Sequence, residues 1–431
     1  MQESIAAIAT ASGTGGVAII RISGGNSLEI ASKMFTPNKN FKPNYMYAGH
    51  IQCDGFTDYG FLVYFKAPKS FTGEDVVELH CHGGVQLARG VLKKCLSLGA
   101  RLADRGEFTK RAFLNGKLTL ASAEGMADMI NAESLALLRA GSMLYSEKLS
   151  NEVKTLQDSL KDILAEVAVE IDYPEEDESG FDLNRIKLKI ASLKAETDGL
   201  VASYKCGKKI KEGVTVAICG KPNTGKSSLL NALLGYEKAI VSAEEGTTRD
   251  AVEGAIEIDG VKYNLIDTAG IRERAGAVES IGIERARQIV AAADIILSVS
   301  EGEEAELPEN ASGDVIRVFN KSDLKKPVGD FDVAVSAKTG EGLDELKKLI
   351  EERSFGDTAL DKAYVVEERH YAALLKTAEA LKSATENLEI LTLDIIAVDL
   401  KDAWDALGEI TGETANEEII STVFSKFCVG K

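Results

Sequence analysis

The chain has 431 residues, of which 45% are hydrophobic and 27% charged, and its formal net charge is −18. This composition is typical of a globular protein with about two to four domains, and so acidic a chain is not expected to bind nucleic acid through a broad basic surface. The six cysteines are scattered without a C-x-x-C pair, which argues against a disulfide framework or zinc finger. Because no signal segment and no apolar run of about 18 residues is visible, we expect a cytoplasmic protein.

Residues 1–118 alternate strand-like and helix-like runs, which is typical of an α+β domain. Strands are predicted over 17–22, 61–65 and 76–82, and helices over 85–98 and 107–115. Gly99 and Gly116 follow the two helices as stop signals. In the run from His80 to His82, strand alternation puts only the two histidines on one face, and two ligands do not make a metal site.

Residues 119–210 and 356–431 are predicted to be helical. One apolar stripe has spacings of 4, 3, 4, 3 and 4 and consists of Leu149, Val153, Leu156, Leu160, Ile163 and Val167. It indicates a long amphipathic helix, which ends at Pro174 before an acidic run, and a further helix covers about 184–204. We expect one all-α helical domain that is interrupted by an inserted domain, with two separate bundles as the alternative.

The inserted domain, residues 211–355, alternates strands and helices as an α/β doubly wound parallel sheet does. The pattern G-x-x-x-x-G-K-[ST] occupies 220–227, between a predicted strand over 214–219 and a helix that begins near Leu229. Backbone N–H groups and the positive end of a helix converge on an anion in such a loop. Lys226 would reach the β- and γ-phosphates of a nucleotide, and the Ser227 hydroxyl would ligate Mg²⁺.

Four further elements follow in the order that a GTP-binding domain requires. Thr248, in the loop 246–250, is predicted to ligate Mg²⁺, and Asp267, after a strand, to hold the Mg²⁺ shell. Asp323 can accept both N1–H and N2–H of guanine, which selects GTP over ATP, and the loop 336–338 would donate to guanine O6. The predicted GTP-binding residues are Asn223, Thr224, Gly225, Lys226, Ser227, Ser228, Ser242, Thr247, Thr248, Asp267, Thr268, Ala269, Gly270, Asn320, Lys321, Asp323, Ser336, Ala337 and Lys338.

Ile271 stands where Ras-type GTPases have the glutamine that orients the attacking water. Hydrolysis of GTP therefore needs another polar group and a cation. The nearby carboxylates and cations are Glu273, Glu279, Glu284, Arg249, Arg272 and Arg274, which the residues alone do not rank. Asn223, inside the phosphate loop, is a neutral oxygen donor suited to a monovalent ion.

Four segments together resemble the MnmE (TrmE) family of bacterial tRNA-modification GTPases. They are 220–228, 246–250, 70–75 (Ser-Phe-Thr-Gly-Glu-Asp) and the terminal 428–431 (Cys-Val-Gly-Lys). The resemblance implies a multidomain chain: an N-terminal folate-binding and dimerisation domain, a discontinuous helical domain, and an inserted Ras-like P-loop G domain. It also implies work with the flavoprotein MnmG (GidA), which carries FAD, in a heterotetramer. The product would be an aminomethyl or carboxymethylaminomethyl group at C5 of the tRNA wobble uridine.

The resemblance also implies how GTP hydrolysis is activated. K⁺ would be coordinated by Asn223, Ser242, Glu244 and Thr247, and would supply the charge of an arginine finger when two G domains dimerise across the nucleotide. The loop at 241–246 is more acidic than is usual in the family. The match to the family's catalytic segment selects Glu279, which would position the water; without the resemblance it reads as a solvated carboxylate.

For the N-terminal domain the resemblance implies binding of 5-formyl- or methylene-tetrahydrofolate. The matching positions are Arg21, Glu78, Lys117 and the terminal Lys431. A carboxylate suits the donors of a pterin and cations suit a glutamate tail, although surface cations and a frayed end are the simpler interpretation. Cys428 is a candidate for one-carbon chemistry, or it only lines the folate pocket.

Two other functions remain open at this stage. One is a ribosome-assembly or translation GTPase, which would not need the folate positions, and the other is a folate-dependent aminomethyl transferase that acts without a partner. The docking place of tRNA is not evident. The cluster Arg101, Arg105, Lys110 and Arg111 and the run 205–211 are candidates, with a solvated face as the simpler interpretation.

Overall fold

The computed structural model describes residues 3–37, 40–173, 182–236, 254–268, 287–302, 312–356 and 364–431. The chain divides into two compact units. The first contains Met1–Ala127, Leu144–Ser179 and Leu400–Lys431, and the second contains Asp128–Met143 and Gly180–Asp399. Each unit joins segments that are far apart in the sequence, so the four successive parts expected from the sequence stay a prediction.

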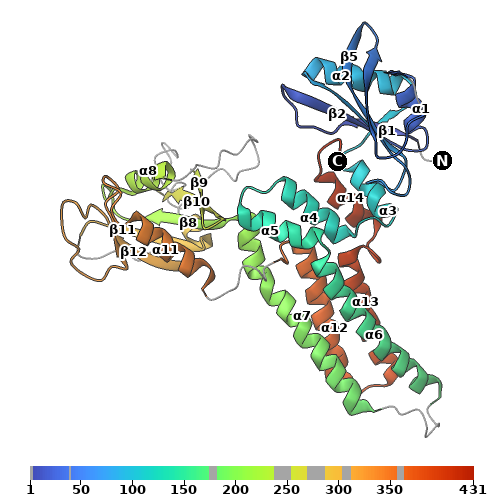
Figure 1. Cartoon of the computed structure of the whole chain (residues 1–431). Coiled ribbons are helices and arrows are strands. Elements are labelled where there is room, and N and C mark those ends of the chain that lie inside the picture. The colour runs from blue at the N-terminus through green and yellow to red at the C-terminus, as the bar shows by residue number, and fades with distance from the viewer. Residues whose placement is uncertain are drawn as a thin grey trace, which may run out of the picture. The chain divides into compact units, whose positions relative to one another are not determined.

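The first unit contains a seven-stranded sheet with the order β3-β4-β5-β6-β2-β1-β7 (Figure 1). Its strands are β1 (Ile5–Ile8), β2 (Gly15–Ser23), β3 (Phe35–Thr36), β4 (Met46–Cys53), β5 (Phe56–Phe65), β6 (Val76–Gly83) and β7 (Arg101–Leu102). Neighbouring strands are antiparallel, except that β1 and β7 are parallel. The three predicted strands are confirmed within β2, β5 and β6; the other four were not predicted.

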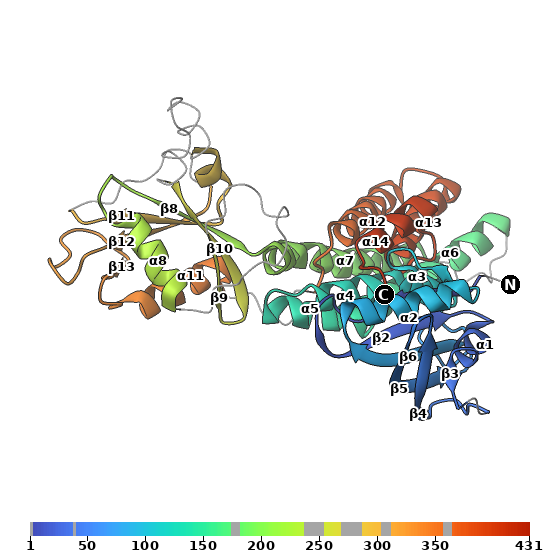
Figure 2. The same cartoon turned by 90° about the horizontal axis from the view of Figure 1, so that it is seen from above.

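Two helices, α1 (Ser27–Ser32) and α2 (Val85–Ser97), cover one face of this sheet. Val91 and Cys95 of α2 are fully buried against β-strand side chains such as Ile20, and Figure 2 shows α2 lying across the sheet. Gly99 follows α2 with a φ of +112°, a backbone conformation that favours glycine. The predicted end of this helix is therefore confirmed.

The opposite face of the sheet carries α3 (Glu107–Leu114), whose Phe108 is fully buried with Ile5, Ala7 and Ala103. The C-terminal helix α14 (Glu417–Ser425) packs beside α3, where the ring of Phe424 lies 6.0 Å from that of Phe113. Phe424 and Phe427 also share a core with Leu120 of α4 (Leu120–Ile130).

Two glycines bring the C-terminal tail against the N-terminal sheet. Gly106 and Gly430 have φ values of +65° and +100°. A Cβ atom at Gly106 would lie 2.5 Å from the carbonyl oxygen of Phe424, and one at Gly430 would collide with the carbonyl oxygen of Ile8. The tail therefore runs in backbone contact with β1, which joins the two ends of the chain in one unit.

The apolar stripe predicted from the sequence lies on α6 (Lys148–Asp172), and all six of its residues are buried. From Leu400 onward, α13 (Leu393–Thr411) belongs to the same unit. Gln157 of α6 donates to the carbonyl oxygen of Trp404 over 3.4 Å. The helical prediction for this region is confirmed, and the acidic run 175–178 lies outside the described residues.

The second unit contains a six-stranded sheet with the order β13-β12-β11-β8-β10-β9. Its strands are β8 (Val214–Cys219), β9 (Gly254–Ile258), β10 (Val261–Asp267), β11 (Ile295–Ser300), β12 (Asp314–Phe319) and β13 (Val333–Ala334). The strands are parallel, as predicted, except at one edge, where β9 runs antiparallel to β10. Asp259 and Gly260 join them with φ values of +45° and +79°, which a two-residue Asp-Gly hairpin turn requires.

Both faces of this sheet are covered, as a doubly wound fold requires. On one face, α8 (Lys226–Tyr236) and α11 (Leu343–Phe355) bury Leu229, Leu233 and Leu346. On the other face, Val290 packs against Ala217 and Ile296.

The second unit also contains α7 (Leu183–Glu212), α12 (Glu368–Asn387), most of α5 (Leu135–Tyr145) and the part of α13 before Leu400. Helix α7 is longer than predicted and ends at Gly213, directly before β8. Lys211 in its last turn pairs with Asp128 over 2.8 Å and with Glu367. No helix within the described ranges combines the length and the apolar character needed to cross a membrane.

Candidate nucleotide and folate sites

The phosphate loop, residues 220–228, joins β8 to α8 at the carboxyl edge of the sheet. Gly220 and Gly225 have φ values of +141° and +87°, and Asn223 also lies in the left-handed region at +66°. A Cβ atom at Gly220 would collide with the carbonyl oxygen of Val299, and one at Gly225 with the Asn320 amide. The two glycines are therefore needed for the close backbone path, which leaves N–H groups free to face an anion.

Lys226 is buried at the start of α8, and its Nζ donates to the carbonyl oxygen of Lys221 over 2.7 Å. Thr224 Oγ1 donates to the same carbonyl over 3.0 Å. The lysine ammonium thus lies across the mouth of the loop, at the positive end of the helix. This is the position from which a lysine can bind nucleotide phosphates.

The predicted Mg²⁺ ligand Ser227 meets Asp267, the carboxylate predicted to hold the Mg²⁺ shell, at this edge. Ser227 Oγ donates to Asp267 Oδ2 over 2.6 Å, and Asp267, at the end of β10, is only 1% exposed. Hydroxyl and carboxylate oxygens are ligands that Mg²⁺ prefers, so the donor set fits this ion. Thr268 uses its hydroxyl elsewhere, donating to the carbonyl oxygen of Ile218 over 2.9 Å.

The predicted guanine corner follows β12 and β13. Ser336 Oγ donates to Asp323 Oδ1 over 2.7 Å, which orients a carboxylate that is otherwise exposed. Asn320 is buried; its amide donates to the carbonyl oxygen of Thr224 over 2.9 Å, and its Oδ1 accepts from Ala337 N over 3.2 Å. Asn320 therefore ties the guanine corner to the phosphate loop.

Lys321 makes a second connection between the same two loops. Its φ is +64°, its Nζ donates to the carbonyl oxygen of Asn223 over 2.8 Å, and it forms an ion pair with Glu301. Glu301 was not predicted as a site residue, because nothing in the glutamate-rich segment after β11 marks one carboxylate as the partner of a residue in another loop. Ser228 and Lys338 are exposed at the same edge.

Several predicted residues lie outside the described part of the chain. They are Ser242, Glu244, Thr247, Thr248, Arg249, Ala269, Gly270, Ile271, Arg272, Glu273, Arg274, Glu279 and Glu284. The predictions for the K⁺ loop and for the catalytic glutamate therefore stay predictions.

In the N-terminal sheet, Arg21 and Glu78 are direct cross-strand neighbours on β2 and β6. Arg21 Nε lies 2.9 Å from Glu78 Oε1, and His80 Nε2 lies 3.3 Å from Glu78 Oε2. Burial raises the pKa of the Glu78 carboxyl, but the hydrogen bonds from His80 and Arg21 and the charge of Arg21 outweigh burial, so its pKa lies below the ordinary value. Glu78 is therefore an ionised acceptor.

The Arg21 guanidinium also lies between two aromatic rings, 5.8 Å from the centroid of Phe71 and 5.7 Å from that of Phe108, within cation–π range. Neither ring was predicted as a site residue, because each comes from a different loop or helix. Together the four side chains form a partly buried corner with a carboxylate, a cation and two flat apolar faces.

The other predicted folate residues lie at two further places. Lys117 Nζ donates to the carbonyl oxygen of Pro68 over 3.1 Å. Cys428 is exposed in the tail, where its carbonyl oxygen accepts from Gly106 N and Lys431 N, both over 3.4 Å. The tail contacts β1 at Ile8, which pairs with Ile20 of β2, next to Arg21. The structure thus brings the tail to the strands that carry the Arg21–Glu78 pair.

The two histidines of β6 contact carboxylates of the same sheet. His80 contacts Glu78, and His82 Nδ1 lies 2.6 Å from Asp58 Oδ1. Among the described residues no group of three or more His, Cys, Asp or Glu side chains is arranged to hold a metal ion.

The carboxyl edge of the second sheet joins a glycine-dependent phosphate loop, a hydroxyl–carboxylate pair and a guanine corner through Asn320. A doubly wound sheet that carries these three features at its carboxyl edge is the G domain of a Ras-like P-loop protein. In this chain the G domain is combined with an α+β domain and long helices.

Comparison with known proteins identifies the family. Residues 120–428 match the family described as "MnmE helical domain", and residues 4–117 match "GTP-binding protein TrmE N-terminus". The chain belongs to the MnmE family. A relative from Natranaerobius thermophilus, named tRNA modification GTPase MnmE, is 40% identical, with 100% of each chain covered. One of the same name from Listeria welshimeri is 40% identical over 100% of this chain and 99% of the relative.

Among solved structures, the G domain of the T. maritima FeoB iron transporter is 27% identical, covering 33% of this chain and 98% of that chain. The TM-score of this match is 0.22.

Proposed function

We propose that this protein is a GTPase that takes part in modifying the wobble uridine of tRNA. The proposal rests on membership of the MnmE family, whose relatives carry the name tRNA modification GTPase. The single observation that carries the GTPase part is the carboxyl edge of the second sheet, where Ser227 meets Asp267 and Asn320 ties the phosphate loop to Asp323. A carboxylate at Asp323 suits guanine, because adenine lacks the two donors that it would accept from.

For the hydrolysis step, Ser227 and Thr248 would ligate Mg²⁺ with Asp267 in its outer shell, which neutralises charge on the phosphates. Ile271 carries no polar group that can orient water, so we assign this role to Glu279. Asn223, with Ser242, Glu244 and Thr247, would hold K⁺ when two G domains dimerise. The test of Glu279 is a Glu279→Ala variant, for which we expect kcat to fall while GTP affinity is kept; unchanged turnover would reassign the role to another carboxylate such as Glu273.

For the one-carbon unit, we propose that a 5-formyl- or methylene-tetrahydrofolate binds in the first unit. The ionised Glu78 suits the N–H donors of a pterin, and the half-buried ring of Phe71 offers a flat apolar surface to it. Lys117 and Lys431 would meet the glutamate tail, and Cys428 would lie near the one-carbon group.

The proposed assembly is a homodimer through the N-terminal domain, joined to an FAD-carrying flavoprotein of the MnmG type in a heterotetramer. One observation supports the homodimer. By strand register, Val17, Met46, Tyr59 and Phe61 share the sheet face opposite α2, and they are 57%, 58%, 55% and 40% exposed. Four large apolar side chains exposed on one face of a sheet suit a protein interface.

The experiment that tests the proposal is nucleoside analysis of tRNA from cells that lack this protein. We expect the wobble uridine to lose its C5 substituent and to regain it when the wild-type chain is restored. Unchanged wobble uridines would favour the rival reading as a ribosome-assembly or translation GTPase. Modification by the purified chain and folate without any flavoprotein would favour the partner-independent transferase.

A further inference from the structure

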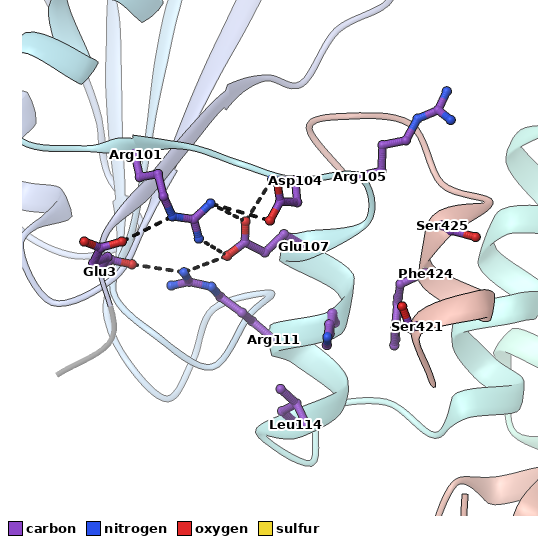
Figure 3. Close-up of a pocket in the computed structure, with 11 residues that line it drawn as sticks. Glu3, Arg101, Asp104, Arg105, Glu107, Arg111, Leu114, Ser421, Phe424 and Ser425 are labelled. Atoms are coloured by element: carbon purple, nitrogen blue, oxygen red, sulfur yellow. Dashed lines mark hydrogen bonds and ion pairs between the residues drawn. The ribbon is translucent and has the colours of Figure 1, made fainter. Parts of the chain in front are cut away.

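A cavity of about 580 Å³ lies in the first unit between the segment 101–107, α3 and α14 (Figure 3). It is lined by Glu3, Arg101, Asp104, Arg105, Glu107, Lys110, Arg111, Leu114, Ser421, Phe424 and Ser425. None of the residues proposed to bind GTP or folate is among them. Four cations and three carboxylates line it, a positive balance on a chain whose formal net charge is −18.

The floor of the cavity is a fixed ion-pair network centred on Glu107. Arg101 contacts Glu107 over 2.5 Å, and Arg111 contacts it over 2.9 Å. Arg111 also contacts Glu74 over 3.0 Å and is only 7% exposed. Burial raises the pKa of Glu107, but the hydrogen bonds from Arg101, from the Asp104 backbone and from Arg111 outweigh burial, so its pKa lies below the ordinary value. Arg101, Glu107 and Arg111 therefore pair their charges with one another and fix the floor of the cavity.

Two cations of the cavity remain available. Within the described part of the chain, neither Arg105 nor Lys110 makes a side-chain ion pair, and Figure 3 shows Arg105 extended away from the network. The backbone of Arg105 is anchored, since it forms an antiparallel bridge with Val429. Across the cavity, α14 offers the exposed hydroxyl of Ser421, whereas the Ser425 hydroxyl already donates to the carbonyl oxygen of Thr422 over 2.7 Å. Two cations without an ion pair, together with the Ser421 hydroxyl, suit the oxygens of a phosphate.

We propose that this cavity binds a phosphodiester group of the tRNA backbone and docks tRNA on the first unit. The inference rests on the proposed function, since it takes tRNA as the substrate. An acidic chain repels a polyanion over most of its surface, so contact must be local, and anchored cations next to fixed ion pairs provide such a place. Asp104 and Glu3 lie at the rim, where their charges are partly offset by Arg101 at 3.7 Å and 3.3 Å.

The test compares two double variants of the full-length chain. Arg105→Ala with Lys110→Ala removes the free cations of the cavity. Arg89→Ala with Lys93→Ala removes the same charge from exposed positions on α2, which covers the other face of the sheet. The dissociation constant for labelled unmodified tRNA is measured by fluorescence anisotropy at about 0.05 to 0.2 M KCl, a range in which loss of phosphate contacts is visible.

For the cavity variant we expect tRNA affinity to fall about tenfold at about 0.15 M salt, and the slope of log affinity against log salt to fall by about 0.7 to 0.9, because one phosphate contact is lost. The α2 variant should stay close to the wild type. Equal effects of the two variants, or a wild-type chain that does not bind tRNA, would overturn the inference. So would calorimetry in which the cavity variant loses binding of inorganic phosphate but keeps tRNA affinity, since the cavity would then be a site for small anions.

GTP turnover, measured on the same proteins, should be unchanged in both variants and reports that they are folded. The proposed function is judged separately, by the wobble uridines of cells that lack the protein. Lost modification in those cells together with equal tRNA binding by the two variants would reject the cavity and keep the function.

Discussion

Ser227 and Asp267 form a 2.6 Å hydrogen bond between the first turn of α8 and the end of β10. The hydroxyl and the carboxylate come from separate motifs, and their contact places two oxygen ligands beside the phosphate loop. Because Asp267 is almost fully buried, its charge acts at this point with little screening by water.

Asp267→Asn is therefore expected to lower kcat for GTP by at least about 100-fold, since the Mg²⁺ shell loses the charged carboxylate that holds it. Binding of GDP in the presence of EDTA should change little. Turnover and GDP affinity are measured side by side, with Asp344→Asn, an exposed carboxylate on α11, as the matched control. Full turnover by Asp267→Asn would show that Mg²⁺ is held elsewhere.

Asp323→Asn is expected to weaken GTP binding by about 100-fold or more, because two hydrogen bonds to a charged acceptor are lost. Ser336 would then face an amide instead of the carboxylate that it now orients. The amide can donate to the additional oxygen of xanthine, so the variant should bind XTP better than GTP. Competition binding with the two nucleotides measures this, and an unchanged preference for GTP would contradict the guanine corner.

The cation dependence of hydrolysis follows from Asn223. Its backbone is held in the left-handed region, with the carbonyl oxygen accepting from Lys321, while its side chain is exposed at the mouth of the loop. If K⁺ acts there, exchange of KCl for NaCl should lower GTP turnover at least about tenfold, and Asn223→Ala should remove the difference between the two salts. Equal kcat in both salts for the wild type would count against a K⁺ site.

Glu78→Gln tests the Arg21–Glu78 pair through pH. Since the folded pKa of Glu78 is lowered, its carboxylate stabilises the fold above the ordinary pKa of glutamate, and this contribution is lost as the pH falls through the folded pKa. At pH 7 the variant should open β2 and β6 more easily by about 1–3 kcal/mol, because a buried charged hydrogen bond is broken. The difference should shrink as the pH falls below the ordinary pKa of glutamate.

Hydrogen exchange of peptides from β2 and β6 in the full-length chain measures this opening free energy at each pH. Glu29→Gln is the matched control, since Glu29 forms a surface ion pair with Lys33 on α1. If the effect of Glu78→Gln does not depend on pH, the packing of the Glu78 side chain and not its charge stabilises the sheet. Folate titrated into the same variant should bind at least about tenfold more weakly.

Most of the G domain could be predicted from the sequence, because each of its motifs is a short local segment. The phosphate loop is specified by the glycines at 220 and 225, which adopt positive φ values, and by the lysine and serine at the start of the following helix. The guanine loop is specified by residues 320–323, which directly follow a strand. The stripe on α6 was equally predictable, since its period is a property of one helix. The antiparallel edge at β9 was missed because a two-residue turn reverses the chain where a parallel connection was expected.

By itself, the sequence determined the phosphate loop, the choice of guanine and the resemblance to the MnmE family, because local spacing carries all three. Tertiary structure alone decided that Arg21 meets Glu78 between the rings of Phe71 and Phe108, and that the tail returns to β1 at Gly430. The same holds for the cavity, where Arg101 and Arg111 are neutralised and Arg105 and Lys110 are not. Those contacts join residues from separate strands, helices and chain ends, and which charges pair depends on how these elements pack together.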